Sequence, residues 1–147
     1  MEVKELGHVV FYVKDFDASR RFYGDILGWK ELGHGRGAAA YSSGRTHHEL
    51  LLLQVGSEAA PIPQNPRVGL YHFGLKIGES DDELRAAIAC LREAGVPISG
   101  MSDHGVTHSV YLHDPDGNEV EIYIDVQPAD WREDPTKIQM FTKPLRI

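Results

Sequence analysis

Two histidines occupy equivalent positions in the two halves of the sequence. His8 and His72 each follow a leucine by two positions and lie 64 residues apart. A single histidine near the start of a strand is more often structural than a metal ligand. The equivalence favours a shared role, because two related modules packed about a pseudo-twofold axis could bring both imidazoles to one metal site.

A carboxylate that could complete this site lies near the end of the second half. Residues 118–125 alternate in polarity, so that Glu119, Glu121, Tyr123 and Asp125 share one face of a predicted strand. A carboxylate in a central strand is costly to bury without a partner. Glu121 lies in the middle of the strand and is the candidate ligand, whereas we expect Glu119, near the turn, to be solvated.

The elements that must position these residues form a repeat. The first half reads as a strand at 7–13, a helix capped by Asp17 and ended by Gly28, and strands at 29–34, 38–43 and 47–55. The second half reads as a strand at 70–77, a helix opened by the capping-box pair Ser80 and Glu83, and strands at 97–102, 107–113 and 118–125. The last two strands are joined by Asp114-Pro115-Asp116-Gly117, a strong hairpin turn.

The repeat predicts an α+β fold in which two tandem βαβββ modules form a curved, mostly antiparallel sheet around a central metal cavity. Module 1 covers about 5–56, and module 2 about 69–126. Between them, the linker 57–68 contains three prolines, and a tail follows at 127–147. We expect all 147 residues to form a single domain.

Composition excludes several other classes of function. Fifteen basic against 22 acidic residues give a net charge of −7, so we expect no nucleic-acid binding. No apolar stretch reaches the length of a membrane span, and the first residues do not resemble a signal peptide, which predicts a cytoplasmic protein. Because Cys90 is the only cysteine, a metal would have to be bound by histidine and carboxylate.

Several stretches together resemble the vicinal oxygen chelate superfamily of glyoxalases, bleomycin-resistance proteins and dioxygenases. Nearly the whole chain takes part, and the resemblance is greatest to the single-domain extradiol catechol 2,3-dioxygenase branch. The stretches are GHVVFYVKDFDASRRFYGDILGWKEL at 7–32, HHEL at 47–50, YHFG at 71–74, DHGVTHSVYL at 103–112, DPDGNEVEIY at 114–123 and DWREDPTKIQMFTKPL at 130–145.

The resemblance implies a set of site residues. The iron ligands of the family, two histidines and a glutamate, fall on His8, His72 and Glu121. Such a facial triad leaves three adjacent positions open. The implied metal is Fe(II), with Mn(II), Zn(II) or Ni(II) as alternatives. His48 matches the acid–base histidine of the family, Tyr111 a tyrosine that hydrogen-bonds substrate, and His104 an additional pocket histidine, while the roles of His108 and Glu49 stay unassigned.

The repeat also bears on glyoxalase chemistry, for which family members typically take two ligands from each module. Aligning 47–55 with 118–126 places Leu50 opposite Glu121, an apolar residue where a fourth ligand would stand. Glu49 could take that place only if the strand were shifted by one residue. In this alignment His48 lies two residues before Leu50, and we expect it to point into the same cavity.

The favoured function is therefore Fe(II)-dependent extradiol cleavage of a catechol-type aromatic substrate by dioxygen. A glyoxalase-like metal-dependent isomerase and a non-enzymatic small-molecule (drug) binding protein remain alternatives. We also expect a homodimer, because the tail through Trp131, Met140 and Phe141 could cover sheet edges in a twofold pairing.

Overall fold

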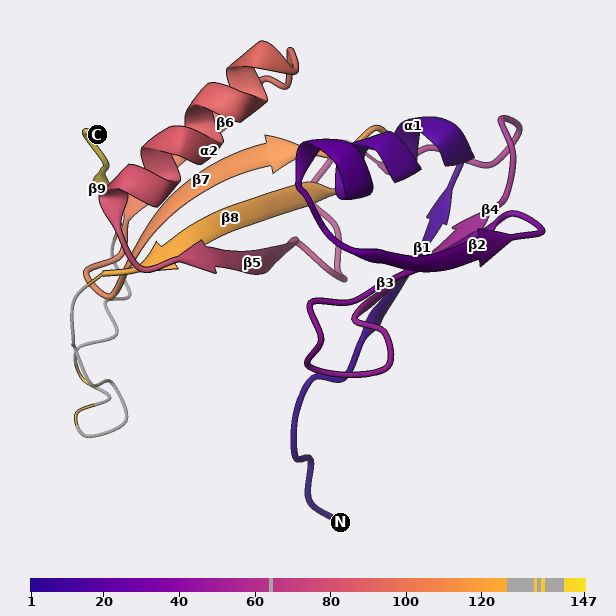
Figure 1. Ribbon diagram of the computed structural model, residues 1–147, viewed down its shortest axis with the longest axis horizontal. Helices are drawn as coiled ribbons and strands as arrows, with labels where there is room; N and C mark the ends of the chain where they lie inside the picture. The colour runs from indigo at the N-terminus through magenta and orange to yellow at the C-terminus, as the bar shows by residue number, and fades with distance from the viewer. Residues whose placement is uncertain (64, 127–133, 135, 137–141) are drawn as a thin grey trace. The chain divides into compact units, whose positions relative to one another are not determined.

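The chain forms two compact units, Met1–Gln64 and Asn65–Ile147, and their boundary falls within the proline-rich linker. The computed structural model shown in Figure 1 describes residues 1–63, 65–126, 134, 136 and 142–147. Each unit contains one β-α-β-β-β succession, which confirms the predicted repeat. Trp131, Met140 and Phe141 lie outside the described residues, and the homodimer stays a prediction.

The first unit is a four-stranded mixed sheet with one helical segment. Strand order is β1-β4-β3-β2, with β1 and β4 parallel and the other pairs antiparallel. The helical segment begins as an α-helix and continues as a π-helix. The elements are β1 (Val9–Val13), α1 (Phe16–Arg20), η1 (Arg21–Ile26), β2 (Glu31–Gly35), β3 (Ala38–Tyr41) and β4 (Leu50–Gln54).

The second unit repeats this topology with one added strand. Its order is β5-β8-β7-β6-β9, and β5 and β8 form the parallel pair. The structure thus has two mixed sheets, one in each unit. The elements are β5 (His72–Gly78), α2 (Asp81–Glu93), β6 (Ile98–Asp103), β7 (Thr107–His113), β8 (Glu119–Asp125) and β9 (Lys143–Pro144).

The two helices differ in how well their first residues were predicted. Ser80 caps α2, and its capping box with Glu83 is present as predicted. Asp17 was the wrong cap for α1. Asp15 has the extended backbone of a cap and accepts a hydrogen bond from the Ala18 amide at 2.9 Å, so Asp17 falls in the first turn.

The helix covers one face of the second sheet and leaves the other face to polar residues. Figure 1 shows α2 lying across β5, β7 and β8. Beneath it, Val120, Ile122 and Ile124 of β8 are buried together with apolar side chains of the helix. Because successive strand residues point to opposite faces, Glu119, Glu121 and Tyr123 lie on the face away from α2.

The strand pairing corrects the predicted alignment of the two halves by one residue. His72 pairs in register with Glu119, and Gly74 pairs with Glu121. In the first unit Val10, which corresponds to Gly74, pairs with Leu51. Leu51 therefore corresponds to Glu121, and Leu50, fully buried, corresponds to Val120. The position that matches Glu121 is again apolar, while Glu49 corresponds to Glu119.

The capping box of α2 makes a measurable contribution to stability. In Ser80→Ala the Glu83 amide loses its side-chain acceptor, so the free energy of unfolding should fall by about 1 kcal/mol. Urea unfolding of this variant against Ser57→Ala, which alters an exposed loop serine, measures the difference. Equal midpoints for the two variants would show that the cap is energetically unimportant.

Candidate functional site

A cluster of polar side chains surrounds the Glu121 carboxylate on the open face of the second sheet. His72 Nε2 lies 3.3 Å from Oε2 of Glu121, and the Tyr111 hydroxyl donates a hydrogen bond of 3.3 Å to Oε1. His104 Nε2 lies 2.8 Å from the Tyr111 hydroxyl and 4.0 Å from Glu121 Oε1. Four residues singled out from the sequence are thus in one cluster, contributed by β5, β7, β8 and the loop after β6.

Strand register accounts for the arrangement of the cluster. Tyr111 on β7 lies directly opposite Glu121 on β8, which brings the phenol to the carboxylate. Gly74 lies opposite Glu121 on the other side. A Cβ there would come within 3.2 Å of the Tyr123 ring and 3.4 Å of Glu121 Oε2. Glycine therefore keeps the space beside the Glu121 carboxylate open.

The Tyr111 phenol is held in its protonated form. Partial burial, followed by the negative charge and hydrogen bond of Glu121, raises the pKa of Tyr111 to about 12. Since its single proton is donated to Glu121, the Tyr111 oxygen can accept from His104, which requires the proton of that imidazole to lie on Nε2.

The donors of His72 and Glu121 fit a divalent metal ion. Two ligand atoms at about 2.1 Å from one ion and at about a right angle would be about 3 Å apart, close to the observed separation of Nε2 and Oε2. Neutral imidazole and carboxylate also suit Fe(II), Mn(II), Ni(II) and Zn(II). The remaining nitrogen of His72, Nδ1, is buried without a hydrogen bond.

Glu119 differs from the prediction that it is solvated. Only 18% of its side chain is exposed, and its Oε1 lies 3.4 Å from His72 Nδ1. Its negative charge is also the main reason why the pKa of the neighbouring Tyr71 is raised. The alternation of residues 118–125 already placed Glu119 and Glu121 on one face, but the closeness to His72 depends on the pairing of β5 with β8.

In the first unit, three imidazoles lie together at the start of β1 and before β4. The ring centroids of His8 and His48 are 4.4 Å apart, and Nδ1 of His47 lies 2.6 Å from Nδ1 of His48. Partial burial, together with the neighbouring His47 and His8, lowers the pKa of His48. His48 precedes β4, so the strand alternation from which its direction was predicted does not apply to it.

Two residues without an assigned role take part in local structure. Nδ1 of His108 lies 2.7 Å from Asp81 Oδ1, which joins β7 to the first turn of α2. The Glu49 carboxylate accepts hydrogen bonds from the Ser43 amide and hydroxyl and pairs with Arg45 Nε at 2.8 Å. These contacts account for Glu49, which is therefore a poor candidate for a fourth ligand.

His8 belongs to the first unit, and His72 and Glu121 belong to the second. Within the described residues, no group of three or more histidine, cysteine, aspartate or glutamate side chains is arranged to hold a metal ion. In the same residues no helix has the length and apolar character needed to span a membrane. The three-ligand set therefore stays a prediction.

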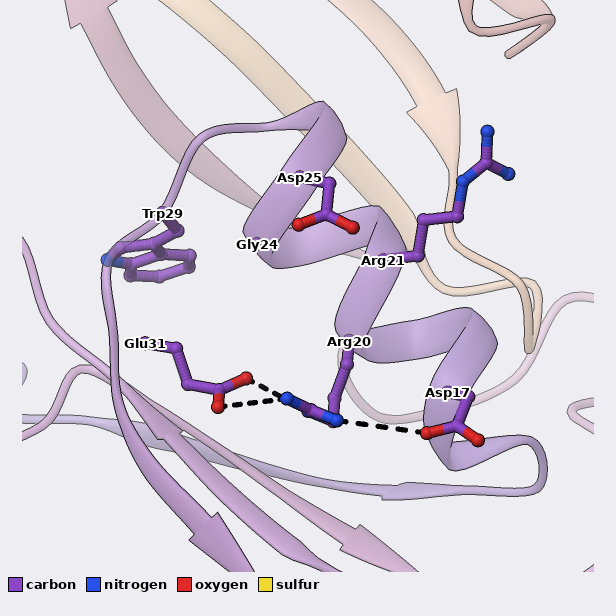
Figure 2. A pocket seen from close by; sticks show the side chains of 7 residues that line it. All are labelled: Asp17, Arg20, Arg21, Gly24, Asp25, Trp29 and Glu31. Atoms are coloured by element: carbon purple, nitrogen blue, oxygen red, sulfur yellow. Dashed lines mark hydrogen bonds and ion pairs between the residues drawn. The ribbon is translucent and has the colours of Figure 1, made fainter.

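A pocket of about 400 Å³ in the first unit contains none of the predicted site residues. Figure 2 shows Trp29 facing the helical segment across this pocket, and Arg20 extending from that segment toward Glu31. Arg20 Nε and Glu31 Oε2 are 2.9 Å apart, and the Tyr41 hydroxyl donates to the same oxygen at 3.1 Å. The pocket is lined by Asp17, Arg20, Arg21, Gly24, Asp25, Trp29 and Glu31.

The fold and the cluster together define a class of protein. Two βαβββ units form the fold, and the second presents a histidine, a glutamate and a tyrosine on its open sheet face, with ligand atoms that suit a divalent metal ion. Residues 5–122 match the family model of the Glyoxalase/Bleomycin resistance protein/Dioxygenase superfamily, and the chain belongs to this superfamily.

Similar proteins include more than one kind of activity. The chain is 33% identical over 134 residues to a catechol-2,3-dioxygenase of Bacillus subtilis, covering 90% of this chain and 46% of that protein. It is 31% identical over 126 residues to the metallothiol transferase FosB of Staphylococcus epidermidis, covering 84% of this chain and 83% of that protein. The chain thus spans about half the length of the dioxygenase.

Among solved structures, a glyoxalase/dioxygenase from Nostoc punctiforme has the same fold. Its TM-score is 0.70 at 24% identity, and the match covers 84% of this chain and 92% of that one. This likeness supports the fold, and the identity is too low to transfer an activity.

The ion pair beside the pocket predicts a dependence of stability on pH. Hydrogen bonds from Arg20, with smaller contributions from His34 and Tyr41, lower the pKa of Glu31 from 4.5 to about 2. The stabilisation is present above pH 4.5 and is lost as the pH falls towards 2. Glu31→Gln should lower the free energy of unfolding by about 1–2 kcal/mol at pH 7.

Denaturant titrations of wild type and Glu31→Gln at pH 7, 5 and 3 test this. The difference between the two proteins should be largest at pH 7 and should shrink between pH 4.5 and 3. Glu58→Gln, a change in an exposed loop residue, serves as control. A difference that does not vary with pH would contradict the assigned pKa.

Proposed function

We propose that this protein is a metal-dependent extradiol dioxygenase that cleaves a catechol-type aromatic ring with dioxygen. The observation that carries the proposal is the convergence of His72, Tyr111 and His104 on the Glu121 carboxylate. The chain is 33% identical to a catechol-2,3-dioxygenase, and the match covers 90% of this chain, which adds independent support.

In this proposal His8, His72 and Glu121 hold one divalent metal ion, with Fe(II) as the resident metal. Two imidazoles and one carboxylate leave adjacent coordination positions free for other ligands. When bound, Fe(II) supplies the redox chemistry that joins dioxygen to an electron-rich ring. Leu51, at the position corresponding to Glu121, offers no fourth ligand, which favours this chemistry over that of a glyoxalase.

His48 is the proposed acid–base residue. Its Nδ1 faces His47 Nδ1 at 2.6 Å, so Nε2 is the atom left to accept a proton from a substrate hydroxyl. If Nδ1 carries the proton in that contact, Nε2 has its lone pair available. The lowered pKa of His48 keeps the imidazole neutral near pH 7, the form that a general base requires.

Tyr111 and His104 orient polar atoms beside the metal position. The Tyr111 phenol, protonated at neutral pH, donates its proton to Glu121 and can turn it toward an oxygen of the substrate. The His104 Nε2–H donates to the phenol oxygen and limits its rotation. Both oxygen atoms of dioxygen enter the product, a ring-opened semialdehyde, so one molecule of dioxygen should be consumed for each ring cleaved.

The metal and the reaction can be tested together. Protein loaded anaerobically with Fe(II) is mixed with a panel of catechols, and oxygen uptake is recorded beside metal content. Wild type should bind one ion per chain and consume oxygen, whereas Glu121→Ala should lose most of the metal because it lacks a ligand. Glu93→Ala, a change at an exposed helix end, is the control.

Retention of all metal by Glu121→Ala would remove Glu121 from the metal site. Metal binding without oxygen uptake on any catechol would favour a glyoxalase-like metal-dependent isomerase. Tight binding of aromatic compounds by metal-free protein would favour a small-molecule binding protein.

The role of His48 predicts a separate result. His48→Ala should keep its metal and lose turnover by about 10²- to 10⁴-fold, the range for a positioned general acid–base group. Metal analysis and oxygen uptake on the same sample provide both numbers. Loss of metal together with turnover would instead make His48 a ligand or a support for His8, whose ring it contacts.

A further inference from the structure

The buried Nδ1 of His72 makes no hydrogen bond, and it faces the carboxylate of Glu119. The Tyr71 hydroxyl is hydrogen-bonded to this carboxylate, which leaves acceptor positions for a second donor. The Glu119 side chain is 18% exposed, and in the described part of the chain it has no ion pair with lysine or arginine. A carboxylate in such surroundings needs a hydrogen-bond donor to offset the loss of water.

The only side-chain nitrogens that ion pairs bring near Glu119, among the described residues, come from histidines on the two neighbouring strands. His72 Nδ1 lies 3.4 Å from Oε1, and His113 Nε2 lies 3.9 Å from Oε2. Register explains the arrangement, because Glu119 lies directly opposite His72 on β5 and His113 on β7. His113 is half exposed and can be hydrated, whereas His72 Nδ1 is buried.

In the first unit, the glutamate that corresponds to Glu119 has a different role. Glu49, which corresponds to Glu119, is bound by Ser43 and Arg45 and holds the loop before β4. Glu119 occupies the equivalent position in the second unit, and among the described residues no arginine pairs with it. Its carboxylate is therefore available to the imidazole beside it.

We propose that Glu119 is a positioning residue that accepts the Nδ1–H of His72 and so leaves the Nε2 lone pair free for the proposed metal ion beside Glu121. A shift of a few tenths of an ångström would turn the 3.4 Å approach into a hydrogen bond. A carboxylate on the far nitrogen of a ligating histidine fixes the tautomer and raises the basicity of the ligand. The inference rests on the proposed metal site and adds the residue that prepares one of its ligands.

The test measures Zn(II) binding and the tautomer of His72 separately. Zn(II) alone, without substrate or dioxygen, is titrated against a chromogenic chelator. Glu119→Ala should weaken Zn(II) binding by about 10- to 100-fold, the range for removal of such a partner. Glu119→Asp, which keeps the charge on a shorter side chain, should recover part of the loss. Asp125→Asn, which removes a charge from the exposed end of the same strand, should bind Zn(II) like wild type.

The tautomer of His72 in metal-free protein is read from nitrogen NMR shifts. Both nitrogens of His72 face a carboxylate in metal-free protein, so the comparison between variants carries the test. The fraction with the proton on Nδ1 should be larger in wild type than in Glu119→Gln, which keeps the shape of the side chain and removes its charge. An unchanged tautomer, or unchanged Zn(II) affinity in Glu119→Ala, would overturn the role of Glu119 alone. Wild-type protein that binds no Zn(II) would overturn this inference together with the proposed metal site, whereas Zn(II) binding without ring cleavage would overturn only the proposed reaction.

Discussion

The cluster depends on the two-sided character of β8. Val120, Ile122 and Ile124 are buried beneath α2, and this packing leaves no freedom for the strand to turn over. The intervening Glu119, Glu121 and Tyr123 are thereby held on the other face at a spacing of two residues. A carboxylate on such a face is only tolerable with partners, and His72, Tyr111 and His104 supply them through strands that flank β8 and the loop after β6.

The strands on either side of β8 determine which side chains surround Glu119 and Glu121. On one side, the parallel pairing with β5 brings His72 opposite Glu119 and leaves Gly74 opposite Glu121, so that space remains above the carboxylate. On the other side, the antiparallel pairing with β7 brings Tyr111 opposite Glu121. As a result, His72 and Glu121 present ligand atoms whose separation suits a divalent ion, and the protonated Tyr111 phenol donates a hydrogen bond to Glu121.

The two units share one topology, but residues at equivalent positions have different roles. In the first unit the position of Glu121 is occupied by Leu51, and the carboxylate of Glu49 stabilises a loop through Arg45. That loop carries His47 and His48, and His48 lies against His8. The first unit therefore presents imidazoles without carboxylate ligands, and the second unit presents the carboxylate.

The sequence by itself determined the features that depend on neighbours along the chain. The capping box of Ser80 and Glu83, the Asp114–Gly117 turn and the alternation of residues 118–125 are local patterns, and each is present as predicted. Local patterns of this kind also predicted the β-α-β-β-β order of both units. The residues of the cluster were singled out by the repeat and by the family resemblance, not by these local patterns.

Only the tertiary structure decided what depends on pairing between distant segments. The pairing of β1 with β4 differs by one residue from the predicted alignment, so Leu51 and not Leu50 corresponds to Glu121. Because β4 begins at Leu50, His48 lies in the loop before this strand. The pairing of β5 with β8 brought Glu119 to His72. Register is set by hydrogen bonds and packing between strands more than forty residues apart in sequence, and the local pattern of either strand is compatible with more than one alignment.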